Sequence, residues 1–394
     1  MPFRGFDLPD ELRMLRDVVA DFVANEIRPA EATVAPDARE LPAEVRAELQ
    51  RKARAAGFWC FEAPREHGGA GLSTFEMVVV LEAASKHKYA FPRAGDGVFG
   101  RTPPVVLYKG TPEQIERYVV PAIDQAWETF TAISEPSGGS DPARAIRTTA
   151  VRDGDTYVLN GRKMWATNAD TAEYGIVHAR TDREGGRGGI SAFIVERATP
   201  GMTVTEVPVL RDHWTTEIAL DDCVVPVGNL VGREGQGFEL AQEFLVRGRL
   251  YYAAQSVGVA EEAVRIAAEW AKQRETFGAL LATRQAVQFA LADSLVEIKA
   301  GRWLTWEAAW KDDQGGDALV DASIAKLYCT EMGFRVVDRM MQIMGGMGVA
   351  KELALEHWFR ALRVSRIVEG PSEVHRYVIA RDLLGSAATG KRMP

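Results

Sequence analysis

Residues 148–166 read TTAVRDGDTYVLNGRKMWA, and this stretch decides the fold class. Asp153-Gly154 and Asn160-Gly161 are dipeptides typical of two-residue hairpin turns, and runs rich in β-branched residues flank both. Further short runs of the same kind follow at 175–180, 190–195, 203–209 and 216–220. The stretch therefore predicts a compact antiparallel β domain, either a barrel or a sandwich.

The sequence is helical on both sides of this β domain. Apolar residues recur at helical spacing from Leu8 to Ile27, and Ser73-Thr-Phe-Glu76 has the pattern of a helix capping box. Beyond the glycine-rich loop at 232–237, we expect helices at 238–273, 284–311, 318–344, 352–362 and 370–384. The predicted fold is an α+β protein with an α-helical N-terminal domain (1–127), a central β domain (128–237) and a C-terminal four-helix bundle (238–394).

Composition excludes several classes of protein. A formal net charge of −8 gives no general attraction to phosphate backbones, so we do not expect nucleic acid as a partner. The three cysteines form no CxxC pair and the histidines have no ligand spacing, so neither a disulfide framework nor a metal is expected. The longest apolar run, Met77–Leu81, is too short to span a bilayer, and the N-terminus lacks the apolar core of a signal peptide. We expect a cytoplasmic protein without a membrane partner.

Two stretches match motifs of other enzyme classes, but their sequence context indicates chance matches. Gly95-Asp-Gly-Val-Phe-Gly100 matches GxGxxG, but no strand precedes it and the prolines that follow cannot open the required helix. Ser323-Ile-Ala-Lys326 matches the SxxK of serine acyl-enzymes, but it lies inside an amphipathic helix and the companion KTG is missing. Neither motif is interpreted as a site.

Glu369 is the strongest candidate for a catalytic base. Ile367 and Val368 precede it, and the Gly370-Pro371 corner that follows opens the last helix. Partial burial among these residues raises the pKa of a carboxyl group, while a nearby helix N-terminus opposes that shift. The alternative interpretation is a glutamate that caps its own helix.

Two further stretches could bind a cofactor. The run from Phe130 to Asp141 contains hydroxyls and a glycine pair, and successive backbone N–H groups in such turns form a nest for a pyrophosphate or a polar ring edge. Trp165 and Thr167 are predicted on the same face of a strand. Trp165 could stack on a flavin; the alternative is a tryptophan in a hydrophobic core. For the run from Phe130 to Asp141, the alternative is a loop that only joins two domains.

Five separated blocks resemble the acyl-CoA dehydrogenase family, and together they cover nearly the whole chain. These blocks are Pro64–Ser73, Ser134–Asp141, Asn160–Asn168, Gln273–Gly278 and Gln342–Gly348. The stretch from Arg366 to Arg376 resembles the block that contains the family's catalytic glutamate. The resemblance implies FAD as cofactor, an acyl-CoA substrate, an electron-transfer flavoprotein as acceptor, and a homotetramer built as a dimer of dimers.

The resemblance also implies roles for individual residues. The flavin ring would be lined by Thr131, Ile133, Ser134, Gly139, Ser140, Trp165 and Thr167. The pyrophosphate and adenosine of FAD would be bound, partly from a neighbouring subunit, by Arg274, Thr276, Phe277, Arg284, Gln285, Gln342, Gly345 and Gly346. Glu369 would be the base, and the CoA thioester would lie against Ser140, Val246, Arg249 and Gly370.

The chain departs from the family pattern at three positions. Pro371 and Glu373 stand where most members have a threonine and a glutamine that contact FAD, although some branches share the EGP form. Val246 stands where an aspartate that contacts CoA is common. The family's alternative position for the base, near residue 248, reads Arg247-Gly-Arg249 and offers no carboxylate, so Glu369 has no rival.

The implied reaction is α,β-dehydrogenation of an acyl-CoA thioester to the 2-enoyl-CoA. One alternative is an oxidase or monooxygenase of the same fold that uses O₂; such monooxygenases lack the carboxylate that Glu369 provides. Another is a flavoprotein without catalytic activity. No motif in the sequence assigns the length, branching or ring structure of the acyl group.

Overall fold

The computed structural model describes residues 7–212 and 215–389. They form two compact units, one made of residues 7–58, 72–99 and 246–389 and the other of residues 59–71, 100–212 and 215–245. No helix in these described residues is long and apolar enough to cross a membrane. The first unit combines N-terminal and C-terminal helices, so this division does not correspond to the three predicted domains. The boundaries of those domains remain a prediction.

The second unit is built on one twisted sheet. Its strands are β1 (Thr129–Ala132), β2 (Thr149–Asp153), β3 (Thr156–Thr167), β4 (Tyr174–Arg180), β5 (Ile190–Glu196), β6 (Met202–Val207), β7 (Thr215–Pro226) and β8 (Leu230–Val231). The order is β6-β7-β3-β2-β4-β5-β8, with β1 beside β4. The unit also contains the short helices α5 (Pro112–Gln114), α6 (Val120–Gln125) and α7 (Pro142–Ala145).

The predicted antiparallel β domain is confirmed in most of its strand pairs and corrected in two respects. Within the described residues the sheet is open, so it is not a barrel. In addition, β4 pairs in parallel with β1 and with β2. The parallel β2–β4 pair has a simple cause: the chain reverses direction once from β2 to β3 and again from β3 to β4, so β4 runs in the direction of β2.

Only one of the two predicted hairpin turns is a turn. Asp153 pairs with Thr156, so Gly154 lies in the tight turn between β2 and β3. Asn160 and Gly161 instead lie inside β3, at a bulge in its pairing with β7. Gly161 has φ 153°, and a Cβ atom there would lie 2.7 Å from the Cα of Thr148. The prediction of a second turn is wrong, because a bulge makes the same demand for glycine as a turn does.

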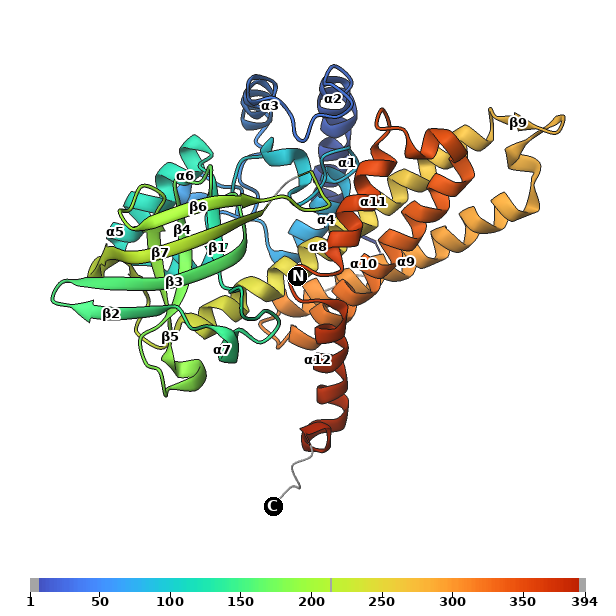
Figure 1. Ribbon diagram of the computed structural model, residues 1–394. Coiled ribbons are helices and arrows are strands. Elements are labelled where there is room, and N and C mark those ends of the chain that lie inside the picture. The colour runs from blue at the N-terminus through green and yellow to red at the C-terminus, as the bar shows by residue number, and fades with distance from the viewer. Residues whose placement is uncertain (1–6, 213–214, 390–394) are drawn as a thin grey trace. The chain divides into compact units, whose positions relative to one another are not determined.

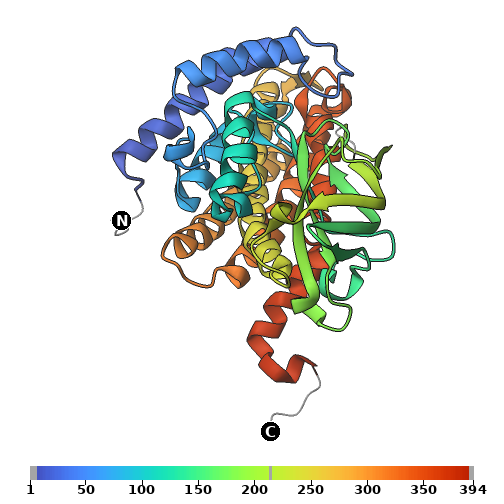
Figure 2. The ribbon, with the colours of Figure 1, turned by 90° about the vertical axis from the view of Figure 1, so that its left-hand side faces the viewer.

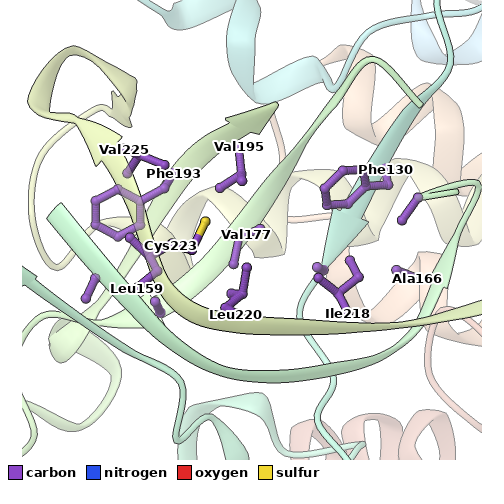
Figure 3. Close-up of a cluster of buried hydrophobic side chains, with 14 of the residues drawn as sticks. Phe130, Leu159, Ala166, Val177, Phe193, Val195, Ile218, Leu220, Cys223 and Val225 are labelled. Carbon is purple, nitrogen blue, oxygen red and sulfur yellow. The ribbon is translucent and has the colours of Figure 1, made fainter. Parts of the chain in front are cut away.

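Alternate residues of the long strands form the core of the sheet. Leu159 of β3, Val177 of β4 and Phe193 of β5 are fully buried together with Ile218 and Leu220 of β7 (Figure 3). The period of two places these side chains on one face of the sheet, where they leave water together.

The first unit consists of helices and one small hairpin. The helices are α1 (Asp10–Phe22), α2 (Arg28–Glu31), α3 (Ala43–Ala55), α4 (Thr74–Ala84), α8 (Gly237–Ala271, which begins in the other unit), α9 (Gln285–Asp313), α10 (Leu319–Met344), α11 (Ala354–Ser365) and α12 (Ser372–Leu384). The hairpin pairs β9 (Glu275–Thr276) with β10 (Ala279–Leu280). The blue helices of Figure 2 include α1 and α3.

The long C-terminal helices begin and end within two residues of their predicted bounds. α10 packs against α9, α11 and α12, and Figure 1 shows α9 and α10 side by side. The capping box at the start of α4 is also confirmed, since Ser73 and Glu76 each bond to the other's backbone N–H. Helical periodicity and end signals were sufficient here because they are local.

Gly161→Ala tests the bulge in β3. We expect the free energy of unfolding to fall by about 2–4 kcal/mol, because the new methyl group would collide with the backbone of Thr148 in a conformation that alanine disfavours. Gly154→Ala is the matched control, since Gly154 also has positive φ but a Cβ atom there meets nothing within 4 Å. It should lose only about 1–2 kcal/mol. Equal losses in urea denaturation would contradict this account of the bulge.

Candidate active site

Glu369 lies in a tight turn between α11 and α12. Its φ of 54° and the φ of 93° at Gly370 place two successive residues in the left-handed region. The turn is closed by hydrogen bonds from the N–H of Ile367 to the carbonyl of Val364 (2.8 Å) and from the N–H of Ser372 to the carbonyl of Arg366 (3.1 Å). A left-handed residue other than glycine costs about 1–2 kcal/mol, so neighbouring contacts must stabilise this backbone.

The carboxylate of Glu369 is partly withdrawn from water. Its Oε2 atom is buried and has no hydrogen-bond partner among the described residues. Burial raises the pKa of Glu369, and the charges of Lys326 and Arg249 oppose that rise. No side chain caps α12, and Pro371 occupies the N-cap position where helix entry was expected. The alternative interpretation of Glu369 as a helix cap is therefore wrong.

Helices α8 and α10 surround the carboxylate. A Cβ atom at Gly248 would lie 3.1 Å from Oε2 of Glu369, so α8 approaches the carboxylate with no side chain between them. The next residue, Arg249, is buried, and its Nη1 donates to Oγ of Ser323 (3.3 Å). From α10, the buried Nζ of Lys326 donates to the carbonyl oxygen of Gly370 (2.7 Å). The structure thus brings Glu369, Gly370 and Arg249 together.

A second layer fixes the start of α12. Glu331 of α10 accepts a hydrogen bond from Oγ of Ser372 (2.7 Å) and forms an ion pair with Arg366 (2.8 Å). Although burial opposes the change, these contacts lower the pKa of Glu331. Glu373 is exposed, with Arg376 at 3.8 Å. The turn that presents Glu369 is therefore anchored at its far end by an ionised carboxylate.

In the second unit, a buried ion pair joins β3 to the loop of residues 133–141, named here the Ser134 loop. Nζ of Lys163 donates to Glu135 (2.8 Å) and to the carbonyl of Ile133 (3.2 Å), and both charged side chains are buried. Glu135 also accepts the backbone N–H groups of Arg147 and Thr148 at 2.8 and 2.9 Å. Because Lys163 of β3 binds the carbonyl of Ile133 and the side chain of Glu135, the two residues that flank Ser134, it fixes the loop against the strand.

Trp165 lies outside the core that a strand tryptophan would normally join. Its side chain is 54% exposed, and it sits at φ 67° beside a second bulge in β3. The N–H of Met164 donates to the carbonyl of Ser134 (2.9 Å), which brings this strand to the Ser134 loop. Thr167 accepts a hydrogen bond from the buried Arg211 (3.2 Å). The alternative of a core tryptophan is wrong.

The other residues predicted to line the flavin ring lie in the Ser134 loop or in β1, the strand that precedes it. Thr131 and Ile133 are partly buried, whereas Gly139 and Ser140 are exposed. Ser140 has φ 61°, and a Cβ atom at Gly139 would meet nothing within 4 Å. The exposed loop therefore offers hydroxyl and backbone donors to solvent.

The residues predicted to bind the pyrophosphate and adenosine of FAD lie far from Glu369 of the same chain. Arg274, Thr276 and Phe277 belong to the β9–β10 hairpin, which Arg284 braces through a hydrogen bond to the carbonyl of Thr276 (2.6 Å). Gln285 begins α9, Gln342 lies in the last turn of α10, and Gly345 and Gly346 begin the short 3₁₀ helix that follows it. With a rise of 1.5 Å per residue, the hairpin is roughly 33 Å along α8 from Arg249, and Gln342 is roughly 24 Å along α10 from Lys326.

Several residues of the site were not predicted. Lys326 was visible only as part of an SxxK match, and Glu331 had no signal at all. His375 is fully buried on α12, where burial and the charges of Lys326 and Arg249 lower its pKa to about 3. A charged residue on the buried face of an amphipathic helix, such as Lys326, is the signal that could have found this network.

Family models match the chain along almost its whole length. They are the N-terminal, middle and C-terminal domains of acyl-CoA dehydrogenase, which match residues 9–126, 131–223 and 235–384. The short-chain specific acyl-CoA dehydrogenase of Bos taurus mitochondria is 36% identical over 393 residues, which cover 98% of this chain and 92% of that protein.

Solved structures agree with these matches. Butyryl-CoA dehydrogenase from Megasphaera elsdenii superposes with a TM-score of 0.85 at 31% identity, covering 96% of this chain and all of that one. PigA with FAD and proline superposes with a TM-score of 0.87 at 26% identity, covering 96% and 99%. On this sequence identity and coverage, the chain belongs to the acyl-CoA dehydrogenase family of FAD-dependent oxidoreductases, with its helical N-terminal, β-sheet middle and helical C-terminal domains.

Proposed function

We propose that this protein dehydrogenates a short acyl-CoA thioester between Cα and Cβ, with Glu369 as the base. The observation that supports this most directly is the buried Oε2 of Glu369, which has no hydrogen-bond partner in the described part of the chain. A carboxylate with an unused lone pair and a raised pKa is a stronger base than one in water. The Cα–H of a thioester is weakly acidic, so its removal needs such a base.

The residues of the second unit fit a flavin. Trp165 leaves a large planar side chain exposed on a bulged strand, and the neighbouring Ser134 loop supplies hydroxyl and backbone donors. We assign the flavin ring to this set and the pyrophosphate and adenosine to the Arg274–Gln285 and Gln342–Gly346 sets, as the family resemblance implies. FAD, when bound, supplies the acceptor for the hydride that leaves Cβ.

The chain's own residues perform the proton step. Oε2 of Glu369 takes the proton from Cα, and the backbone N–H of Glu369 is proposed to donate to the thioester oxygen as negative charge develops there. Arg249 and Lys326 oppose the effect of burial and so favour the ionised carboxylate before the reaction. Withdrawal of Glu369 from water keeps its lone pair available for the substrate.

A short acyl group is supported by the names of the relatives and by the aromatic residues next to α8. The ring of Phe91 stacks on that of Tyr252, with centroids 6.0 Å apart, and Tyr252 follows Arg249 by one turn of α8. Nε2 of Gln255 donates to the carbonyl of Pro92 (3.2 Å), which holds this loop against the helix. We propose that these rings limit the length of the acyl chain. Anaerobic bleaching of the flavin across short, branched, cyclic and long acyl-CoAs tests this assignment.

The electron acceptor that reoxidises the flavin distinguishes two candidate functions, a dehydrogenase and an oxidase. We propose an electron-transfer flavoprotein as acceptor, as in the family resemblance. The second candidate is an O₂-using oxidase, because the chain also superposes on the prolyl acyl carrier protein oxidase AnaB, with a TM-score of 0.85 at 25% identity. Peroxide formed in step with substrate consumption would favour the oxidase, whereas slow reoxidation in air and fast reoxidation by the flavoprotein would favour the dehydrogenase.

We predict that the protein is a homotetramer in solution. Phe277 at the hairpin tip is 101% exposed, and Phe289 and Val296 of α9 are 58% and 69% exposed, so a single chain leaves large apolar side chains in water. Contact with another copy would cover them. Light scattering should give four times the 43.3 kDa chain mass. A monomer that retains all of its FAD would contradict the prediction.

Trp165→Ala tests the flavin assignment. Because Trp165 is outside the core, the free energy of unfolding without FAD should change by less than about 1 kcal/mol. The dissociation constant for FAD should rise roughly tenfold or more through lost stacking. Val151→Ala, an exposed position on β2 of the same sheet, is the matched control. Unchanged FAD affinity in Trp165→Ala, measured by titration of the FAD-free protein, would remove this residue from the site.

Glu369→Gln tests the base. The amide keeps the size of the side chain and loses the basic lone pair, so FAD content and folding should be retained while flavin reduction by the best substrate slows ~10²–10⁴-fold. Glu369→Asp should be less damaging but still slow, because withdrawal by one methylene spoils the reacting geometry.

Glu352→Gln is the control for this experiment, since Glu352 is an exposed carboxylate in the turn before α11. Stopped-flow absorbance of the flavin is the measurement. If Glu369→Gln reduces its flavin within roughly tenfold of the unaltered protein, the role assigned to Glu369 is wrong.

A further inference from the structure

Ser323 and Lys326 form a motif that the proposed function leaves unused. Both are buried on the same face of α10. Oγ of Ser323 donates to the carbonyl of Leu319 (2.7 Å) and accepts from Nη1 of Arg249 (3.3 Å). Because the hydroxyl proton of Ser323 is bound within its own helix, the serine is not an activated nucleophile. The lysine instead donates to the carbonyl of Gly370, the residue after Glu369.

A buried ammonium at this position requires an explanation. Removing a charged group from water is unfavourable unless it gains partners, and an apolar side chain would pack at lower cost. Burial lowers the pKa of Lys326 to about 7, although the charge of Glu369 opposes this change. The hydrogen bond to Gly370 and the charge of Glu369 are the interactions that offset the lost hydration.

We propose that Lys326 is a positioning residue for Glu369, an inference that rests on the proposed role of Glu369 as base. The bond from Nζ of Lys326 to the carbonyl of Gly370 stabilises the left-handed backbone that presents the carboxylate. The positive charge of Lys326 favours the ionised form of that carboxylate, which is the form that accepts a proton. Lys326 therefore acts on the reaction through Glu369, without touching the substrate.

The other charged and titratable groups around the pair are Arg249 of α8, Glu331 of α10, and Glu373 and His375 of α12. The pKa of His375 is lowered to about 3, so this ring is neutral near neutral pH. Glu331 is already ionised in its bonds to Ser372 and Arg366, and a guanidinium such as Arg249 stays charged. Lys326, whose pKa is lowered by burial to about 7, therefore changes its charge beside Glu369 near neutral pH.

Two variants separate the charge of Lys326 from its hydrogen bond. Lys326→Gln removes the charge and keeps an N–H donor, whereas Lys326→Met replaces both with an apolar side chain of similar length. Flavin reduction should then be measured anaerobically from about pH 6 to about pH 9. In Lys326→Gln the ratio of the rate at low pH to that at high pH should fall roughly tenfold below the ratio of the unaltered protein. Lys326→Met should be slower at every pH as well, because the Gly370 carbonyl loses its donor.

A second measurement does not depend on activity. Without Lys326, the folded-state pKa of Glu369 lies further above its unfolded value. The stability that this provides is fully present below the unfolded pKa and is lost as pH rises through the folded pKa. Between about pH 5 and about pH 8, the melting temperature of Lys326→Gln should therefore fall more than that of the double variant Lys326→Gln/Glu369→Gln.

The controls distinguish failure of this inference from failure of the proposed function. Lys311→Gln removes a more exposed lysine that pairs with Glu307 and Asp321, and it should leave the pH dependence unchanged. If Glu369→Gln keeps its rate, the proposed function fails, and the melting curves still test the coupling to Lys326. Rate profiles of Lys326→Gln that parallel those of the unaltered protein, or parallel melting curves for the single and double variants, would overturn the role of Lys326.

Discussion

The left-handed backbone at Glu369 and Gly370 is the constraint on which the candidate active site depends. The Oε2 atom of Glu369 has no partner among the described residues, so its place is set by the main chain. The main chain is in turn fixed by Lys326 at the Gly370 carbonyl and by the Ser372–Glu331 bond at the start of α12. Helix α10 therefore determines where the carboxylate points.

The same arrangement occurs in the second unit. Lys163, with its pKa lowered by burial to about 8, bonds to the carbonyl of Ile133 and pairs with Glu135. In each unit a fully buried lysine binds a main-chain carbonyl beside a residue assigned to the site. Lysine suits this task because one compact charge with three donors can serve a carbonyl and a carboxylate together. Each unit thus orients a loop through a hydrogen bond from a charged lysine to a main-chain carbonyl, since apolar packing has no direction that could orient the backbone.

Sequence patterns predicted the parts of this fold that depend on local signals. The ends of α8, α9, α10 and α12 follow from helical periodicity and glycine stops, and Asp153-Gly154 makes the turn expected of it. The turn predicted at Asn160-Gly161 was wrong because a bulge and a turn both require glycine, and only the pairing with the partner strand distinguishes them. Lys326 and Glu135 bond to groups distant in sequence, so a local pattern can mark Lys326 as an unusual buried charge but cannot identify the partner of either residue. The positions of Glu369 and Arg249 in one site were predictable, whereas the orphaned Oε2 and the second cationic neighbour, Lys326, were not.

The hairpin of β9 and β10 lies at the far end of α8 from Arg249, and this separation has a consequence for handling the protein. In the proposed assembly, one copy supplies Glu369 and another supplies the hairpin to the same cofactor. FAD binding and subunit association are then linked equilibria, in which each strengthens the other. The apparent affinity for FAD would therefore depend on protein concentration, and dilution alone would release cofactor from a chain whose fold is intact.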